Sequence, residues 1–145
     1  MSDNPFDLSG KVIAITGASS GFGHHFAGVL AGHGATVILG ARREEKLAER
    51  VAQIQAAGGQ AHAARLDVRD TQSIKDFIDL AFNDFGRLDV VINNAGVEAG
   101  AKTYAMIDEE DWDYVLDTNL KSAWVVSKYT PSRCWPKNRA AATSS

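Results

Sequence analysis

A cluster of glycines and small polar residues follows an apolar segment near the start of the chain. The apolar segment 11–16 is short and partly β-branched, and the loop Thr16–Gly23 follows it and opens an amphipathic stretch. Glycines allow a sharp turn and a close approach of the backbone to a ligand. The first turn of a helix offers unpaired N–H groups and a partial positive charge. The loop therefore suits the pyrophosphate of a dinucleotide, and a purely structural tight turn is the less favoured alternative.

Three further motifs follow in order along the chain. Asp67-Val68 comes after the third expected strand, Asn93–Gly96 reads Asn-Asn-Ala-Gly after the fourth, and Asn119 lies in the last expected helix. With Thr-Gly-x-x-x-Gly-x-Gly at 16–23, these motifs resemble those of the short-chain dehydrogenase/reductase family over about residues 8–130. The resemblance implies an oxidoreductase that transfers hydride between a nicotinamide cofactor and a small carbonyl or alcohol substrate.

The resemblance also assigns roles to individual residues. Asn119 matches the asparagine of the family's catalytic tetrad. Phe22 departs from the family, which often has isoleucine between the last two glycines of the loop. The expected cofactor-binding residues are Thr16, Gly17, Ser19, Ser20, Gly21, Phe22, Gly23, Arg42, Arg43, Asp67, Val68, Asn93, Ala95 and Gly96.

The residues after the second expected strand bear on the choice between NADP and NAD. Sites for NAD usually place an acidic residue there, which binds the ribose 2′-hydroxyl. This sequence has Ala41 at that position, followed by Arg42 and Arg43. A guanidinium can pair with a 2′-phosphate through two hydrogen bonds, and the missing carboxylate removes a repulsion. NADP is therefore the expected cofactor, and NAD is the alternative. A second alternative is that Arg42 and Arg43 are solvated residues before the next helix and have no part in cofactor choice.

The tyrosine and lysine that the family uses for catalysis have no counterpart here. In the family, a lysine four positions after the tyrosine lowers the pKa of that tyrosine, which acts as a general acid or base. Tyr104, Tyr114 and Tyr129 each lack a lysine four positions later. We therefore expect no turnover by this chain alone. The alternatives to an oxidoreductase are a non-catalytic nucleotide-binding module and a non-functional truncated fragment.

Strand-like and helix-like segments alternate along the chain and must position these residues. Apolar runs indicate strands at 11–16, 36–39 and 88–92, with a weaker alanine-rich candidate at 60–66. Helical periodicity indicates helices at 22–33, 44–57, 71–85 and 109–129. The apolar residues expected to face the core are Phe26, Val29 and Leu30 in the first helix, and Trp112, Val115, Leu116, Leu120 and Ala123 in the last.

The alternation of strands and helices determines the expected fold class. Parallel neighbours need crossover connections, and continuous apolar strands indicate a sheet that is covered on both faces. We therefore expect an α/β fold with a doubly wound, Rossmann-type parallel sheet, truncated after the fourth strand and the following helix. The family's strand order, 3-2-1-4, would leave 88–92 as a bare apolar edge.

Composition excludes several classes of protein. The net charge of −3 argues against binding of nucleic acid by phosphate neutralisation, and no stretch approaches the roughly 20 apolar residues of a membrane span. A single cysteine, Cys134, excludes an internal disulfide and fits a reducing cytoplasm. His24 and His25 are adjacent and do not share a helix face, so no metal site is expected. Pairing of two copies through the last helix is the one protein contact that the resemblance suggests.

The segment 131–145 breaks the pattern of the preceding chain. It contains Pro131 and Pro136 and has no apolar periodicity, so irregular structure is expected. When its codons are shifted by two bases, the segment from Arg133 can encode a Gly-Gly turn and an apolar run that resemble the family's approach to its next strand. We therefore expect a dinucleotide-binding domain at 1–130 and a frameshifted, out-of-frame tail at 131–145.

Overall fold

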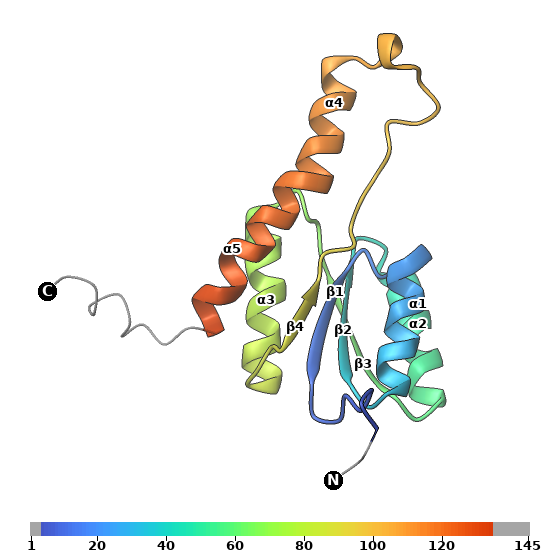
Figure 1. Cartoon of the computed structure of the whole chain (residues 1–145), viewed down its shortest axis with the longest axis vertical. Coiled ribbons are helices and arrows are strands. Elements are labelled where there is room, and N and C mark those ends of the chain that lie inside the picture. Colours follow the sequence, from blue (N-terminus) through green and yellow to red (C-terminus); the bar gives the residue numbers. More distant parts are fainter. Residues whose placement is uncertain (1–3, 135–145) are drawn as a thin grey trace, which may run out of the picture.

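Four parallel strands form the sheet of the computed structural model, which describes residues 4–134 (Figure 1). The strands are β1 (Val12–Thr16), β2 (Thr36–Ala41), β3 (Gln60–Arg65) and β4 (Val90–Ile92). Their order is β3-β2-β1-β4, and each neighbouring pair is parallel. The expected α/β class and strand order are therefore confirmed, and β4 forms one edge of the sheet.

Helices cover both faces of this sheet (Figure 1). α1 (Gly21–Gly32) and α2 (Glu44–Ala56) lie on one face, and α3 (Thr71–Phe85) and α5 (Ser122–Cys134) lie on the other. A short 3₁₀ turn, η1 (Tyr104–Met106), precedes α4 (Glu109–Leu116), which extends beyond the end of the sheet. The π-helical turn η2 (Asp117–Lys121) joins α4 to α5.

The side chains of β1 alternate between two hydrophobic cores, as the period of a strand requires. Ile13 and Ile15 belong to the core beneath α1 and α2. Val12 and Ala14 belong to the core beneath α3 and α5. Because β1 is buried on both faces, all five of its residues are buried, which explains its continuous apolar sequence.

The buried face of α1 differs from the expected one. Phe26 is 38% exposed and Val29 is 45% exposed, whereas the buried residues of the helix are Gly23, Ala27 and Ala31. The cause is the close packing of α1 against the glycine loop, since a Cβ at Gly23 would lie 2.5 Å from Asn94 Nδ2. Only small side chains fit along this contact, so Phe26 and Val29 face outward, whereas Leu30 is half-buried and packs against the core as expected.

The expected inner face of the last helix is also wrong. Trp112 is 53% exposed and Leu120 is 65% exposed. The buried residues of this region are instead Thr118, Ser122, Val125 and Val126. Trp112 lies on α4, which extends beyond the end of the sheet, and from Asp117 onward the wider π-helical turn changes the rotation per residue and so the face that follows.

Pro131 does not end the last helix, contrary to the expectation from sequence. α5 continues past it to Cys134. A proline removes one backbone donor, but the preceding turns of a formed helix can carry the chain through that position as a kinked helix. Residues 135–145, expected to be irregular, lie outside the described residues.

Within 4–134, no helix combines the length and apolar character needed to cross a membrane.

Candidate functional site

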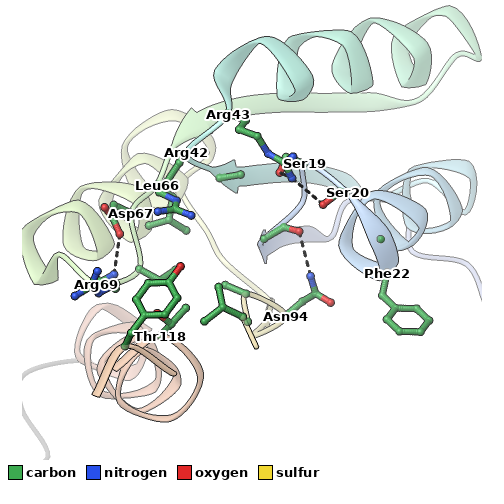
Figure 2. Close-up of a pocket in the computed structure, with 18 residues that line it drawn as sticks. Ser19, Ser20, Phe22, Arg42, Arg43, Leu66, Asp67, Arg69, Asn94 and Thr118 are labelled. Atoms are coloured by element: carbon green, nitrogen blue, oxygen red, sulfur yellow. Dashed lines mark hydrogen bonds between the residues drawn. The ribbon is translucent and has the colours of Figure 1, made fainter. Parts of the chain in front are cut away.

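A hollow of about 680 Å³ lies at the carboxyl ends of the strands (Figure 2). Its lining comes from the loop after β1, the end of β2, the segment after β3, the loop after β4, and the η2 region. In doubly wound sheets, ligands bind at this edge, where the strand order reverses. The lining residues expected from sequence are Gly17, Ser19, Ser20, Gly21, Phe22, Arg42, Arg43, Asp67, Val68, Ala95 and Gly96.

The backbone of the glycine loop explains why two of its positions exclude a side chain. Gly17 has φ +68°, and a Cβ there would lie 2.8 Å from the Cα of Ala95. Gly23 is not among the lining residues, and its role is to let α1 approach the loops. The absence of side chains at these two positions therefore lets the loop after β4 and α1 pack closely against the glycine loop.

The first turn of α1 is open to an anion. Ser20 is the N-cap residue, but its side chain makes no capping hydrogen bond, and no acidic residue stands in the first turn. The N–H groups at the start of a helix have no partner within the helix, and they favour negative charge. This end of the hollow therefore fits the pyrophosphate of a dinucleotide.

Arg43 and Arg42 differ in direction. Arg43 Nη2 donates hydrogen bonds to Ser19 Oγ at 2.9 Å and to Ser20 Oγ at 2.8 Å. Arg42 extends instead toward the side of the hollow where Asp67 lies (Figure 2). The two arginines thus place positive charge at separate points of the same site.

Asn94 connects the loops after β1 and β4 and was not among the expected site residues. Its Nδ2 donates to the carbonyl oxygens of Thr16 at 3.1 Å and Gly17 at 3.2 Å. Thr16 Oγ1 accepts from the backbone N–H groups of Asn94 and Ala95, both at 3.0 Å. Thr16 is only 1% exposed and is not a lining residue, so it shapes the site from beneath.

The far end of the hollow is built from the segment after β3. Leu66 is buried, and Asp67 Oδ1 accepts a hydrogen bond from the backbone N–H of Arg69 at 3.0 Å. Arg69 and Tyr114 also line the hollow, although neither was expected from sequence. The two residues lie far apart in the sequence, and neither belongs to a recognised motif. The sequence analysis therefore gave no reason to place them in the site.

Asn119 lies in the π-helical turn and does not line the hollow. Its Oδ1 accepts from the N–H of Val97 at 2.8 Å, and its Nδ2 donates to the carbonyl of Val97 at 2.8 Å. This pair of hydrogen bonds holds the loop after β4 against the helix. Both polar ends of the side chain are therefore engaged with backbone in this structure.

Two other expected residues do not direct their side chains into the hollow. The ring of Phe22, 76% exposed, points away from the hollow, so only its backbone faces the glycine loop (Figure 2). Asn93 is exposed and donates to Ser127 Oγ at 3.5 Å instead of lining the hollow. Among residues 4–134, no group of three potential metal ligands is placed to hold a metal ion.

Asp89 fixes the start of β4 relative to β1. Its Oδ2 accepts from the N–H of Val12 at 2.8 Å and from Arg87 Nε at 2.9 Å. The hydrogen bond from Arg87 is the largest cause of a lowered pKa for the Asp89 carboxyl, and the Val12 N–H and the charge of Lys11 lower this pKa further. An ionised Asp89 therefore anchors the strand whose end carries Asn94.

Fold and site together define a dinucleotide-binding α/β protein. The sequence model of the short chain dehydrogenase family matches residues 11–134. The chain therefore belongs to the short-chain dehydrogenase/reductase family.

Relatives of this chain include a reductase and a dehydrogenase from bacteria. The 3-oxoacyl-(acyl-carrier-protein) reductase of Thermotoga maritima is 39% identical over 121 residues, which are 83% of this chain and 49% of that protein. The 3beta-hydroxysteroid dehydrogenase of Mediterraneibacter gnavus is 37% identical over 114 residues, covering 79% of this chain and 41% of that protein. The chain thus spans about half the length of the curated relatives it matches.

Solved structures agree with this assignment. A metagenomic short-chain oxidoreductase in complex with NADP has a TM-score of 0.82 and 35% identity, covering 88% of this chain and 57% of that one. A short-chain type dehydrogenase/reductase from Mycobacterium marinum has a TM-score of 0.84 and 30% identity, covering 88% of this chain and 51% of that one. Both similarities therefore extend over most of this chain.

Proposed function

We propose that the chain provides the cofactor-binding part of an NADP(H)-dependent oxidoreductase that acts on a carbonyl or alcohol substrate. The observation that carries the proposal is the hollow of about 680 Å³, with a glycine loop and an open helix N-terminus at one end and Arg42 and Arg43 along its wall. Bound there, the nicotinamide would supply the hydride acceptor or donor.

The preference for NADP over NAD follows from the charges near the end of β2. Ala41 offers no carboxylate to the ribose 2′-hydroxyl. Arg43 already holds the hydroxyls of Ser19 and Ser20, which together form a group of donors suited to a 2′-phosphate. Arg42, exposed on the same wall, adds a second positive charge.

Calorimetric titration of the full 145-residue chain with NADPH and NADH tests this proposal. NADPH should bind more tightly, and Arg43→Ala should reduce the ratio of the two affinities by about tenfold, the value of one lost charge-assisted hydrogen bond. Lys46→Ala, which removes an exposed cation of α2 outside the hollow, serves as the control and should keep the ratio. Equal affinity of the wild-type chain for both cofactors would refute the NADP preference, and no affinity for either would refute the function.

The chain by itself is expected to bind cofactor without turnover. Its sequence contains no tyrosine with a lysine four positions later, which is the pair that tunes the acid or base in this family. This observation favours, as the second candidate, a nucleotide-binding module without catalysis. Addition of a C-terminal half that carries the tyrosine–lysine pair separates the two candidates, since only the cofactor-binding part of an oxidoreductase should then oxidise NADPH with a carbonyl compound.

Pairing of two copies is proposed for the outer side of the last helices. Four apolar residues stand at intervals of four along α4, η2 and α5 and remain exposed. We call these residues the outer stripe: Trp112, Leu116, Leu120 and Trp124. Exposed apolar patches of this kind commonly mark protein contacts.

A reducing compartment such as the cytoplasm is proposed as the location of the protein, because the sequence contains a single cysteine.

A further inference from the structure

A contact between two side chains closes the end of the hollow farthest from the glycine loop. Arg69, in the segment after β3, has its Cζ 5.0 Å from the ring centroid of Tyr114 on α4. Both residues line the dinucleotide hollow, and both also line a second hollow with Glu110, Asp111 and Asp113. The pair is therefore a partition between the two hollows.

The backbone of Arg69 is held in place, and its side chain remains available to a ligand. Asp67 Oδ1 accepts the N–H of Arg69, so the turn after β3 fixes where the side chain begins. Asp111, an acid of the second hollow, pairs with Lys102. Among the described residues, the Arg69 guanidinium forms no ion pair, and its side chain contacts the tyrosine ring.

A guanidinium is planar and stacks on aromatic rings through either face. The Arg69 guanidinium lies over the Tyr114 ring, and the side chain of Arg69 lines the hollow in which the far end of a dinucleotide would lie. An adenine ring is aromatic and can stack on an arginine plane. The features that suit the pyrophosphate lie at the opposite end, around Ser20 and the start of α1, so this end is left for the adenosine and its base.

We infer that Arg69, supported by Tyr114, is a positioning residue that stacks on the adenine base of the cofactor. The inference rests on the proposed function, since it requires a dinucleotide in the hollow. It assigns to Arg69 a role in base recognition that is separate from the phosphate recognition assigned to Arg42 and Arg43.

Titration of the full chain with 2′,5′-ADP, which carries the base and the 2′-phosphate, tests the inference. Arg69→Ala and Tyr114→Leu should each weaken binding by about five- to tenfold, as expected for a partly desolvated cation–π stack. Tyr114→Phe keeps the ring and should bind like wild type. Arg69→Lys keeps the charge but loses the plane, so it should restore less than half of the lost binding free energy. Arg65→Ala, an exposed arginine outside the hollow, is the matched control.

Stacking also predicts coupling between the two residues. The double variant Arg69→Ala/Tyr114→Leu should bind only slightly more weakly than either single variant, because each change removes the same stack. The inference is overturned if Arg69→Ala binds like Arg65→Ala, or if Arg69→Lys restores full affinity, which would indicate charge alone. Failure of the wild-type chain to bind 2′,5′-ADP would instead overturn the proposed function, and this inference with it.

Discussion

The hydroxyl of Thr16 organises the site without touching the hollow. It accepts from the backbone N–H groups of Asn94 and Ala95, and Thr16 is almost fully buried. Thr16→Val keeps the shape but leaves two buried donors without an acceptor, so the free energy of unfolding should fall by about 2 kcal/mol. Urea denaturation measures the change. Thr16→Ser, which retains the hydroxyl, should lose less, and an equal loss in both variants would contradict this role.

Asp89 makes stability depend on pH. Its carboxyl has a pKa lowered from the ordinary 3.8, chiefly by the hydrogen bond from Arg87. Because the folded-state pKa lies below the unfolded one, the stabilisation is fully present above the unfolded pKa and is lost as pH falls through the folded pKa. Asp89→Asn should therefore reduce the free energy of unfolding by about 1 kcal/mol at pH 7, a value that allows for the exposure of Arg87.

Urea denaturation of wild type and Asp89→Asn at pH 7 and at pH 3 checks this. The difference between the two proteins should shrink at the lower pH, because pH 3 lies below the ordinary carboxyl pKa of 3.8, so Asp89 of the unfolded chain takes up a proton there. A difference that stays constant across this range would mean that the charge of Asp89 contributes nothing. Asp84→Asn, an exposed carboxyl near the end of α3, is the control and should show little effect at either pH.

The sequence predicted site residues best where the backbone sets their position. The glycine loop, Arg42 and Arg43, and Asp67 follow strand ends directly, so the parallel sheet brings them to one edge. Arg69 and Tyr114 could not be predicted in this way, because their contact depends on how far α4 extends beyond the sheet. Asn119 was recognised by its motif, but its engagement with Val97 depends on the π-helical turn.

At the scale of elements, α1 shows how a ligand site constrains helix packing. The helix approaches the loops after β1 and β4 so closely that an added Cβ at Gly23 would lie 2.5 Å from Asn94 Nδ2 and 2.7 Å from the carbonyl oxygen of Gly17. Apolar periodicity favoured a face through Phe26 and Val29, because periodicity measures hydrophobicity and contains no information on the distance between elements. The element bounds were predicted well, whereas the buried face was not.

Gly23→Ala tests this packing. The new methyl group must displace Asn94 or shift α1, so NADPH affinity should fall at least tenfold, and the free energy of unfolding should fall by about 1–3 kcal/mol, as for overpacking. Gly32→Ala is the matched control on the same helix, because its added Cβ meets nothing within 4 Å. That variant should be slightly stabilised, since alanine is the better helix former. Equal behaviour of the two variants in calorimetry and denaturation would contradict the argument.

The π-helical turn η2 is the element that holds the loop after β4. It presents Asn119 to the backbone of Val97, with a donor and an acceptor at 2.8 Å each. Asn119→Ala should speed hydrogen exchange at the Val97 amide by about fivefold or more, because the acceptor of that amide is lost. Asn119 is exposed, so global unfolding should change little. Unchanged exchange at Val97 by NMR would show that the loop is held by other contacts.

At the scale of the whole molecule, the chain has a complete two-faced core around β1 but an open edge at β4. Val90 on that edge is 45% exposed, and β4 pairs with β1 alone among the described strands. The sequence predicted this edge from strand order. Trp112, Leu116 and Leu120 of the outer stripe were expected on the inner face of the last helix and are exposed instead. The molecule therefore carries two apolar surfaces that could lead to association.

Variants that place a charge on each surface can distinguish association through the outer stripe from association through the edge of β4. We expect the chain to self-associate through the outer stripe, so Leu120→Glu should shift sedimentation velocity profiles toward monomer by raising the dimer dissociation constant at least tenfold. Leu120 is 65% exposed, and the melting temperature of the monomer should therefore be retained. Val29→Glu, on the exposed side of α1, is the control and should leave association unchanged. If Val90→Lys abolishes association and Leu120→Glu does not, the copies pair through the free edge of β4, because a charged residue on an edge strand blocks strand addition.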